Sequence, residues 1–177
     1  MSRPADLRSW LLMAPLMIGI FLSPLNVVFT SLSLPTMRND FGITVEQATW
    51  VGSAYFIPSV AFMPMQGFLG QHWGVRRVYA AGLLLLSAGG LGAALAPDMT
   101  ALLLARIVQG VGWSALYPLA LVLIRSHFPA GQQGEMMGVW ESAVGLATIV
   151  APLVGGVVVQ RYGWRALYGI LGGAALL

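Results

Sequence analysis

One arginine lies inside a long apolar stretch of this chain. Residues 102–114 read L-L-L-A-R-I-V-Q-G-V-G-W-S, and Arg106 falls within an apolar run that extends from Ala101 to Ile124. A helix of about 20 apolar residues crosses a bilayer, and a charged side chain within it almost always faces the protein interior or a watery cavity. Arg106 is therefore the first candidate for a functional group. The alternative is an arginine that only holds helices together by binding neighbouring carbonyl groups.

Two further groups of residues could share a site with this arginine. Helical spacing places Gly110, Trp113 and Tyr117 on the face of Arg106, so that this face offers a cation, a gap and two aromatic rings. Glu141 is the only carboxylate well inside an apolar run, which makes it a candidate proton-coupling group. The alternative for Glu141 is a side chain near the inner membrane surface that reaches water or a loop arginine.

A polar stripe keeps to one helical face of the first apolar run. Its members are Gly19, Ser23, Asn26, Thr30 and Ser33. Lipid cannot satisfy polar groups, so we expect the stripe to face the helix bundle or a cavity. The hydroxyl groups could instead bond back to their own helix, but the Asn26 amide needs more partners than that.

Composition indicates that membrane-spanning helices hold these residues in place. The chain has 177 residues, of which 58% are hydrophobic and only 8% are charged, which excludes a soluble domain and predicts an all-α integral membrane protein. All nine basic residues are arginine, and they punctuate the apolar runs, so the positive charge reflects membrane topology and not nucleic-acid binding. With no cysteine and two distant histidines, we expect neither a metal site nor a cofactor.

Six apolar segments are predicted to be membrane helices. They cover about residues 10–34, 45–69, 78–96, 101–124, 135–159 and 166–177. Pro35 should end the first of these segments. The pattern Thr44-x-x-Gln47 predicts a capping box at the start of the second segment, and Pro58 and Pro64 should bend that segment. The last segment is incomplete as a membrane helix, because a dozen residues cannot cross a core of about 30 Å at 1.5 Å per residue.

Arginine distribution predicts the orientation in the membrane. With the N-terminus inside, the inner segments hold more arginines than the outer ones. The inner set is Arg3, Arg8, Arg76, Arg77 and Arg125, and the outer set is Arg38, Arg161 and Arg165. The positive-inside rule therefore predicts a multi-pass protein of the plasma (inner) membrane with a cytoplasmic N-terminus.

Four kinds of segment together resemble the major facilitator superfamily. The stretch from Gly67 through Gly74 to Arg76 and Arg77 is similar to its loop motif between spans two and three, G-x-L-a-D-r-x-G-r-r. The stretch Leu102-x-x-x-Arg106-x-x-Gln109-Gly110-x-Gly112 is similar to its span-four motif, and Ala151-Pro152-x-x-Gly155-Gly156 to its span-five antiporter motif, G-P-x-x-G-G. Residues 25–35, 50–55 and 164–165 resemble segments of the multidrug-efflux branch, the drug:proton antiporters with 14 spans.

The resemblance implies an alternating-access transporter with two six-helix halves around a central cavity, of which this chain supplies the N-terminal half. It assigns Arg106 to proton coupling, Pro152 and its neighbouring motif residues to an antiport hinge, and the 67–77 loop to a cytoplasmic latch. The candidate cavity residues are Ser23, Asn26, Thr30, Gln109, Trp113 and Tyr117. The implied partners are the lipid bilayer, a small-molecule substrate, protons, and a second six-helix half or a second copy of the chain.

Several positions depart from the family pattern, among them Ala151 in place of the first glycine of the span-five motif. The loop motif has Gln71 in place of its acid and Val75 in place of an arginine, and Gln133 stands where the branch has an arginine. These changes remove charges that would form a salt-bridged latch. Asn26 stands where the branch has an acid in span one, and an amide cannot titrate, so proton coupling through this position is absent.

Three classes of function are compatible with these patterns. The first is an exporter of lipophilic, often cationic, compounds by proton antiport. The second is a non-transporting membrane interaction protein or a truncated remnant of an exporter, which the missing latch charges favour. The third is a membrane-embedded serine hydrolase, suggested by Gly112-x-Ser114-Ala115, but no histidine lies within a span to act as the base. We therefore expect a transporter and not an enzyme.

Overall fold

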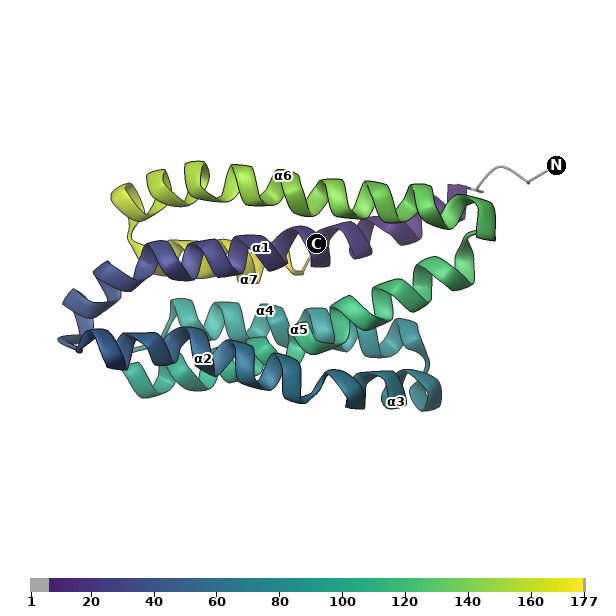
Figure 1. Cartoon of the computed structure of the whole chain (residues 1–177). Helices are drawn as coiled ribbons and strands as arrows, with labels where there is room; N and C mark the ends of the chain where they lie inside the picture. The colour runs from purple at the N-terminus through teal and green to yellow at the C-terminus, as the bar shows by residue number, and fades with distance from the viewer. Residues whose placement is uncertain (1–6, 177) are drawn as a thin grey trace.

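The computed structural model is α-helical throughout the part of the chain that it describes (Figure 1). It describes the backbone of residues 7–176, and the side chains of residues 18–176 except those of residues 20 and 127. The helices are α1 (Leu7–Phe41), α2 (Val45–Ala61), α3 (Met63–Trp73), α4 (Val75–Ala94), α5 (Met99–His127), α6 (Ala130–Tyr162) and α7 (Trp164–Ala174). The apolar runs of the sequence therefore form an all-α bundle, as its composition predicts.

The helices lie side by side and alternate in direction, except that α3 continues in the direction of α2 (Figure 1). The start of α1, the α3–α4 turn and the α5–α6 turn share one end. The α1–α2, α4–α5 and α6–α7 connections share the opposite end, and the α2–α3 break lies between the two ends. The most extensive contacts join α4 with α5, α1 with α6, α2 with α5, and α4 with α7. Helix α5 therefore lies at the centre, with α2 and α4 packed along it.

Helix α1 continues past the proline that was expected to end it. The prediction of a stop at Pro35 was wrong, because α1 runs on to Phe41. A proline inside a helix costs about 3 kcal/mol, but the turns beyond it are held by tertiary contacts. Met37 is fully buried, and the Phe41 ring packs edge-on against Trp164 at 5.6 Å between ring centroids. The burial of Met37 and the contact of Phe41 with the start of α7 outweigh the missing backbone hydrogen bond.

The second predicted span is broken into α2 and α3. It begins at the predicted capping box, in which the Gln47 backbone N–H donates to Thr44 Oγ1 and the Thr44 N–H donates to Gln47 Oε1. Helix α2 ends at Ala61, and α3 restarts with Pro64 in its first turn, where no backbone donor is needed. The span is thus broken into two helices and not only bent, as its two prolines had predicted.

Within the described residues, three helices are long and apolar enough to cross a membrane by themselves. They are α4, residues 99–126 of α5, and α6. Helices α2 and α3 have 17 and 11 residues and follow one another through Phe62. Because that break divides one apolar segment, neither piece has the length of a span.

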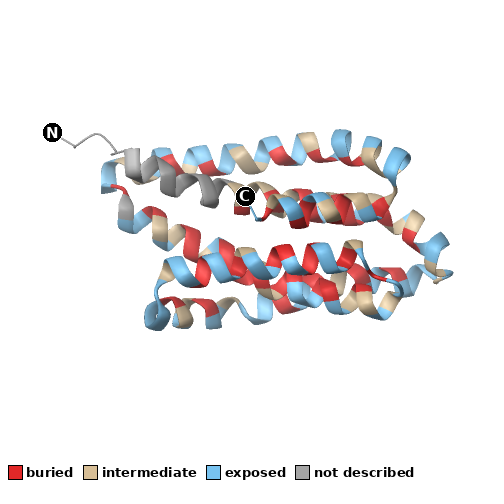
Figure 2. Ribbon diagram, turned by 180° about the vertical axis from the view of Figure 1, so that it is seen from behind, coloured by how far each residue is buried: buried red, intermediate tan, exposed pale blue. Residues whose placement is uncertain are grey.

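Small residues bring α4 and α5 into close contact. A side chain at Gly112 would come within 2.6 Å of the Gly82 carbonyl oxygen, and one at Gly89 within 2.6 Å of the Gln109 backbone nitrogen. Membrane helices lack a hydrophobic driving force between them, so such close backbone packing is a main source of their association. The buried residues accordingly follow the facing sides of these helices (Figure 2).

Candidate functional site

Arg106 lies in the centre of the bundle and is almost fully buried, with 1% of its surface exposed. Its Nε donates to the Val51 carbonyl oxygen of α2 at 3.1 Å. Its Nη1 donates to Asn26 Oδ1 of α1 at 2.6 Å and to Gln109 Oε1, one turn along α5, at 2.7 Å. One guanidinium therefore joins three helices, and the spacing Arg106-x-x-Gln109 places donor and acceptor on the same helical face.

Two tyrosines complete the surroundings of this guanidinium. Arg106 Cζ lies 4.5 Å from the ring centroid of Tyr55 and 5.5 Å from that of Tyr168, distances at which the negative ring faces attract a cation. The Tyr168 hydroxyl lies 3.1 Å from Thr30 Oγ1, and that hydroxyl donates to the Asn26 carbonyl oxygen at 2.7 Å. We call Arg106, Asn26, Gln109, Tyr55 and Tyr168 the arginine cluster.

The arginine cluster contains no carboxylate. Every hydrogen-bond partner of the Arg106 guanidinium within the described residues is a neutral oxygen. The ion pair that the structure does define lies elsewhere, at 3.3 Å between Arg165 and Asp40, where the α1–α2 connection meets α7. Asn26 occupies the place nearest the guanidinium from α1, so the amide gives an acceptor oxygen without a negative charge.

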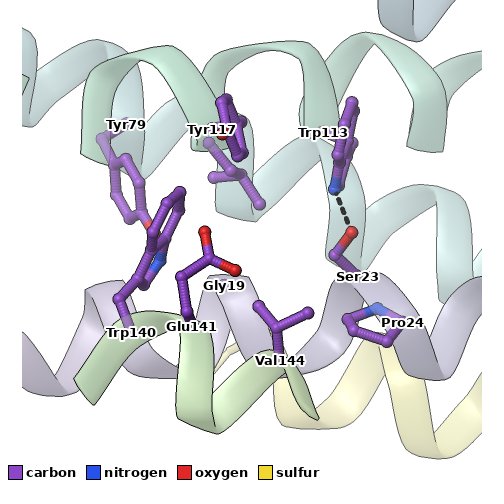
Figure 3. A pocket seen from close by; sticks show the side chains of 10 residues that line it. Gly19, Ser23, Pro24, Tyr79, Trp113, Tyr117, Trp140, Glu141 and Val144 are labelled. Carbon is purple, nitrogen blue, oxygen red and sulfur yellow. Dashed lines mark hydrogen bonds between the residues drawn. The ribbon is translucent and has the colours of Figure 1, made fainter. Parts of the chain in front are cut away.

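A cavity of about 300 Å³ lies next to the arginine cluster, between α1, α4, α5 and α6 (Figure 3). Trp113 Nε1 donates to Ser23 Oγ at 2.7 Å across it, and the rings of Tyr117 and Trp140 lie 5.0 Å apart. The Glu141 carboxylate points into the space beneath the aromatic side chains of α5. The cavity therefore combines aromatic walls with one carboxylate.

The structure divides the predicted site residues into two groups. Ser23, Trp113 and Tyr117 line the cavity together with Glu141, which is exposed there and not enclosed by protein. Asn26, Thr30 and Gln109 are buried in or against the arginine cluster and are absent from the cavity lining. Sequence reasoning thus joined two sites that lie one helical turn apart.

Two aromatic cavity residues were missed from the sequence, Tyr79 of α4 and Trp140 of α6. Trp140 is fully buried, and its indole N–H has no hydrogen-bond partner. Its place directly before Glu141 gave no signal, because consecutive residues of a helix point in directions about 100° apart. Tyr79 had none, because the sequence does not say which face of α4 turns toward α1.

The two family motifs outside the cavity lie on helix ends and on a helix contact. In the latch motif, Gly74 is the single residue between α3 and α4, and its φ of +92° is one that glycine adopts easily. Arg76 and Arg77 follow it and are exposed, while Gly67 has no neighbour that a side chain would meet.

In the hinge motif, α6 runs without interruption through Pro152. Ala151 and Gly155 are buried, and a side chain at Gly155 would come within 2.9 Å of the Phe29 ring of α1. Pro152 is exposed, and Gly156 has open space where a side chain would lie. The motif thus has one face against α1 and one face that nothing in the described chain covers.

Within the described residues, no group of three His, Cys, Asp or Glu side chains could hold a metal ion. The chemistry of the site is therefore that of one buried cation, one exposed carboxylate and several aromatic rings.

Comparison with known proteins identifies the fold. Residues 16–177 match the model of the Major Facilitator Superfamily. The chain is similar to the riboflavin transporter RibZ of Clostridioides difficile (29% identity over 91% of this chain) and to the multidrug transporter protein MdtP of Bacillus subtilis (31% over 89%). It spans 35% and 29% of the length of these two relatives.

Its fold also resembles that of the inward-open xylose transporter XylE of E. coli, with a TM-score of 0.83 and 16% identity. That likeness covers 95% of this chain and 46% of the xylose transporter. The seven helices thus form part of the fold of a multi-pass membrane transporter and not of an enzyme. From its fold and from the match over residues 16–177, the chain belongs to the major facilitator superfamily.

Proposed function

We propose that this chain forms the N-terminal half of an exporter of lipophilic small molecules, which works by alternating access with proton antiport. The observation that carries the proposal is the cavity, in which Glu141 faces the rings of Trp113, Tyr117 and Trp140. The similarity of this chain to a multidrug transporter protein supports the same substrate class. Lipophilic cations suit such a cavity, because aromatic rings bind both apolar surface and positive charge.

Glu141 is the proposed proton-coupling group. It is the only carboxylate deep within a long apolar helix that also borders the cavity. A proton and a cationic substrate cannot both neutralise one carboxylate, so their exchange at this position would couple their movements. Arg106 would support the cycle by holding α1, α2 and α5 together, and Asn26 takes no proton.

A second body must cover the apolar surface of this chain for it to function. Leu146, Ile149 and Leu153 on α6 are each more than half exposed, and Glu141 on the same helix is exposed as well. A carboxylate facing lipid would be costly, so we propose that a second six-helix half, or a second copy, closes the cavity. The protein would lie in the plasma (inner) membrane with the N-terminus in the cytoplasm.

The test is Glu141→Gln in the full-length transporter, reconstituted in vesicles with an imposed pH gradient. Efflux of a fluorescent lipophilic cation should become independent of the gradient, because the amide cannot exchange a proton. Glu135→Gln is the matched control: Glu135 lies on the same helix, is exposed, and does not line the cavity. Unchanged pH dependence in Glu141→Gln would place the coupling group outside this chain.

A non-transporting interaction protein is the second candidate, and one observation favours it. Gln133 Nε2 donates to the backbone oxygens of Arg125 and Phe128 at 3.2 and 3.1 Å, so it caps the end of α5 instead of forming a charged latch. Gln71 is also uncharged, so the cytoplasmic latch that the family resemblance implies lacks two of its ion-pair partners. Absence of any efflux by the full-length protein, in vesicles where its insertion is verified, would support this candidate.

A further inference from the structure

The arginine cluster has more buried hydrogen-bond donors than acceptors. The amide oxygens of Asn26 and Gln109 both accept from Arg106 Nη1, which leaves their NH2 groups, Nδ2 and Nε2, buried without a partner. The Tyr55 hydroxyl, whose ring faces the same guanidinium, is also buried and unpartnered. A buried donor left unsatisfied costs about 1–3 kcal/mol, so three around one cation call for an acceptor.

The cluster also lacks a negative charge. A buried charge is normally paired, because transfer of an unpaired ion out of water is very costly. Arg106 is 1% exposed, and each of its three defined acceptors is neutral. The missing acceptor and the missing charge have a common solution, which is a small anion among the amide groups and the tyrosine hydroxyl.

The neighbouring cavity provides a path to this position. Ser23 and Asn26 are one turn apart on α1, and Gln109 and Trp113 are one turn apart on α5, so the cluster lies one turn from the cavity. Trp113 separates them: its indole N–H binds Ser23 at the cavity, and its ring lies 6.3 Å from that of Tyr55. Rotation of one side chain would therefore open the cluster to an ion.

We propose that the arginine cluster is a binding site for a small monovalent anion, held by Arg106 and by the free NH2 groups of Asn26 and Gln109. The anion supplies the negative charge that an acid at position 26 would have provided. This site is separate from the substrate cavity and from Glu141, so it stands whether or not the protein exports drugs. Its occupant is a halide or the carboxylate of an organic solute, since both accept several hydrogen bonds.

The first experiment measures the thermal stability of the purified 177-residue chain in lipid nanodiscs. Chloride replaces gluconate, a much bulkier anion, at constant ionic strength. The melting temperature should rise with the logarithm of the chloride concentration above the dissociation constant, by about 5–10 °C at a hundredfold excess. The line width of the ³⁵Cl nuclear magnetic resonance signal should broaden in parallel, which reports binding directly. A melting temperature that responds neither to chloride nor to acetate in the same titration would overturn the proposal and leave water as the occupant.

Asn26→Asp is the decisive variant. Its carboxylate pairs with Arg106 from within the chain, so the melting temperature in gluconate should rise and the chloride response should disappear. Arg106→Gln should also lose the response, and Arg125→Gln, which removes an exposed arginine at the end of α5, should keep it. If Arg106→Gln fails to fold, Asn26→Asp still decides. A chloride response in Asn26→Asp equal to that of the wild type would refute the site.

Acetate then distinguishes the two sources of the anion. Acetate is a carboxylate of similar size, and it replaces chloride in the same titration. A response to acetate alone assigns the site to the carboxylate of an organic solute. A response to chloride, with or without acetate, assigns it to an inorganic ion, and either result supports an anion site at Arg106.

Discussion

Gly110 fixes the distance between α2 and α5 on which the arginine cluster depends. A methyl group at this position would collide with the Tyr55 carbonyl oxygen and would come within 2.7 Å of the Pro58 ring. Neither group can rotate away, because one is backbone and the other is a proline ring inside the helix. In Gly110→Ala, α2 and α5 must therefore move apart.

The cost of this substitution can be worked out from its contacts. Overpacking of this kind costs about 1–3 kcal/mol. The separation also stretches the 3.1 Å hydrogen bond from Arg106 Nε to the Val51 oxygen, and a bond from a charged donor is worth about 1.5–3 kcal/mol. The higher helix propensity of alanine offsets about 0.5–1 kcal/mol of this loss in folding stability. With the bond weakened and not lost, we expect a net destabilisation of about 2 kcal/mol.

Thermal unfolding of the 177-residue chain in detergent, followed by tryptophan fluorescence, measures the effect. A loss of about 2 kcal/mol should lower the melting temperature by about 4–8 °C in a chain of this size. Gly52→Ala is the matched control, since Gly52 lies on α2 beside Val51 and has open space where a side chain would lie. It should leave the melting temperature unchanged or slightly raised. Equal stability of Gly110→Ala and the wild type would show that the α2–α5 distance is not what holds Arg106.

Three further predictions concern the buried arginine, the topology and the α1–α7 contact. Arg106→Ala should abolish efflux by the full-length transporter, while membrane insertion, measured by surface labelling, should stay intact or improve. Efflux by Arg106→Lys should be impaired as well, because an ammonium lacks the fixed geometry of the guanidinium. Single cysteines should react with an impermeant maleimide in intact cells at Asn39 but not at His72, and the reverse would refute a cytoplasmic N-terminus. Trp164→Phe removes the 2.7 Å hydrogen bond to Asp40 Oδ2 and should lower the melting temperature by about 2–4 °C for each 1 kcal/mol lost; no change would mean that ring packing alone holds this contact.

Much of the fold was predictable because lipid imposes a simple rule. A chain with 8% charged residues must satisfy its backbone inside helices, so an all-α bundle followed from composition. The burial of Arg106 followed in the same way, since a cation in an apolar run has no other favourable position. The capping box at Thr44 was also readable, because it depends on residues three positions apart.

The features that were not predictable depend on contacts between distant segments. The continuation of α1 beyond Pro35 depends on the burial of Met37 and on the contact of Phe41 with Trp164, more than 100 positions later. The place of Trp140 in the cavity had a similar cause. Helix α6 is apolar on almost every side, so its sequence periodicity does not define an inner face. The contact of Gly155 with α1 sets that face, and the sequence alone does not give the rotation.

The amide of Asn26, at a position where the branch that this chain resembles has an acid, leaves Arg106 without a negatively charged partner. A carboxylate at position 26 would have neutralised Arg106 and left Glu141 as a second, independent acid. With the amide, Arg106 keeps its full charge inside the bundle, and Glu141 faces the cavity one turn away with no basic group against it. The positive charge of Arg106 therefore lies on the buried side of Trp113, and the Glu141 carboxylate is exposed on the cavity side. A cationic solute would meet the carboxylate first and would be repelled from the arginine, whereas a small anion would be drawn past Trp113. The two proposed sites would thus select ions of opposite sign on the two sides of Trp113.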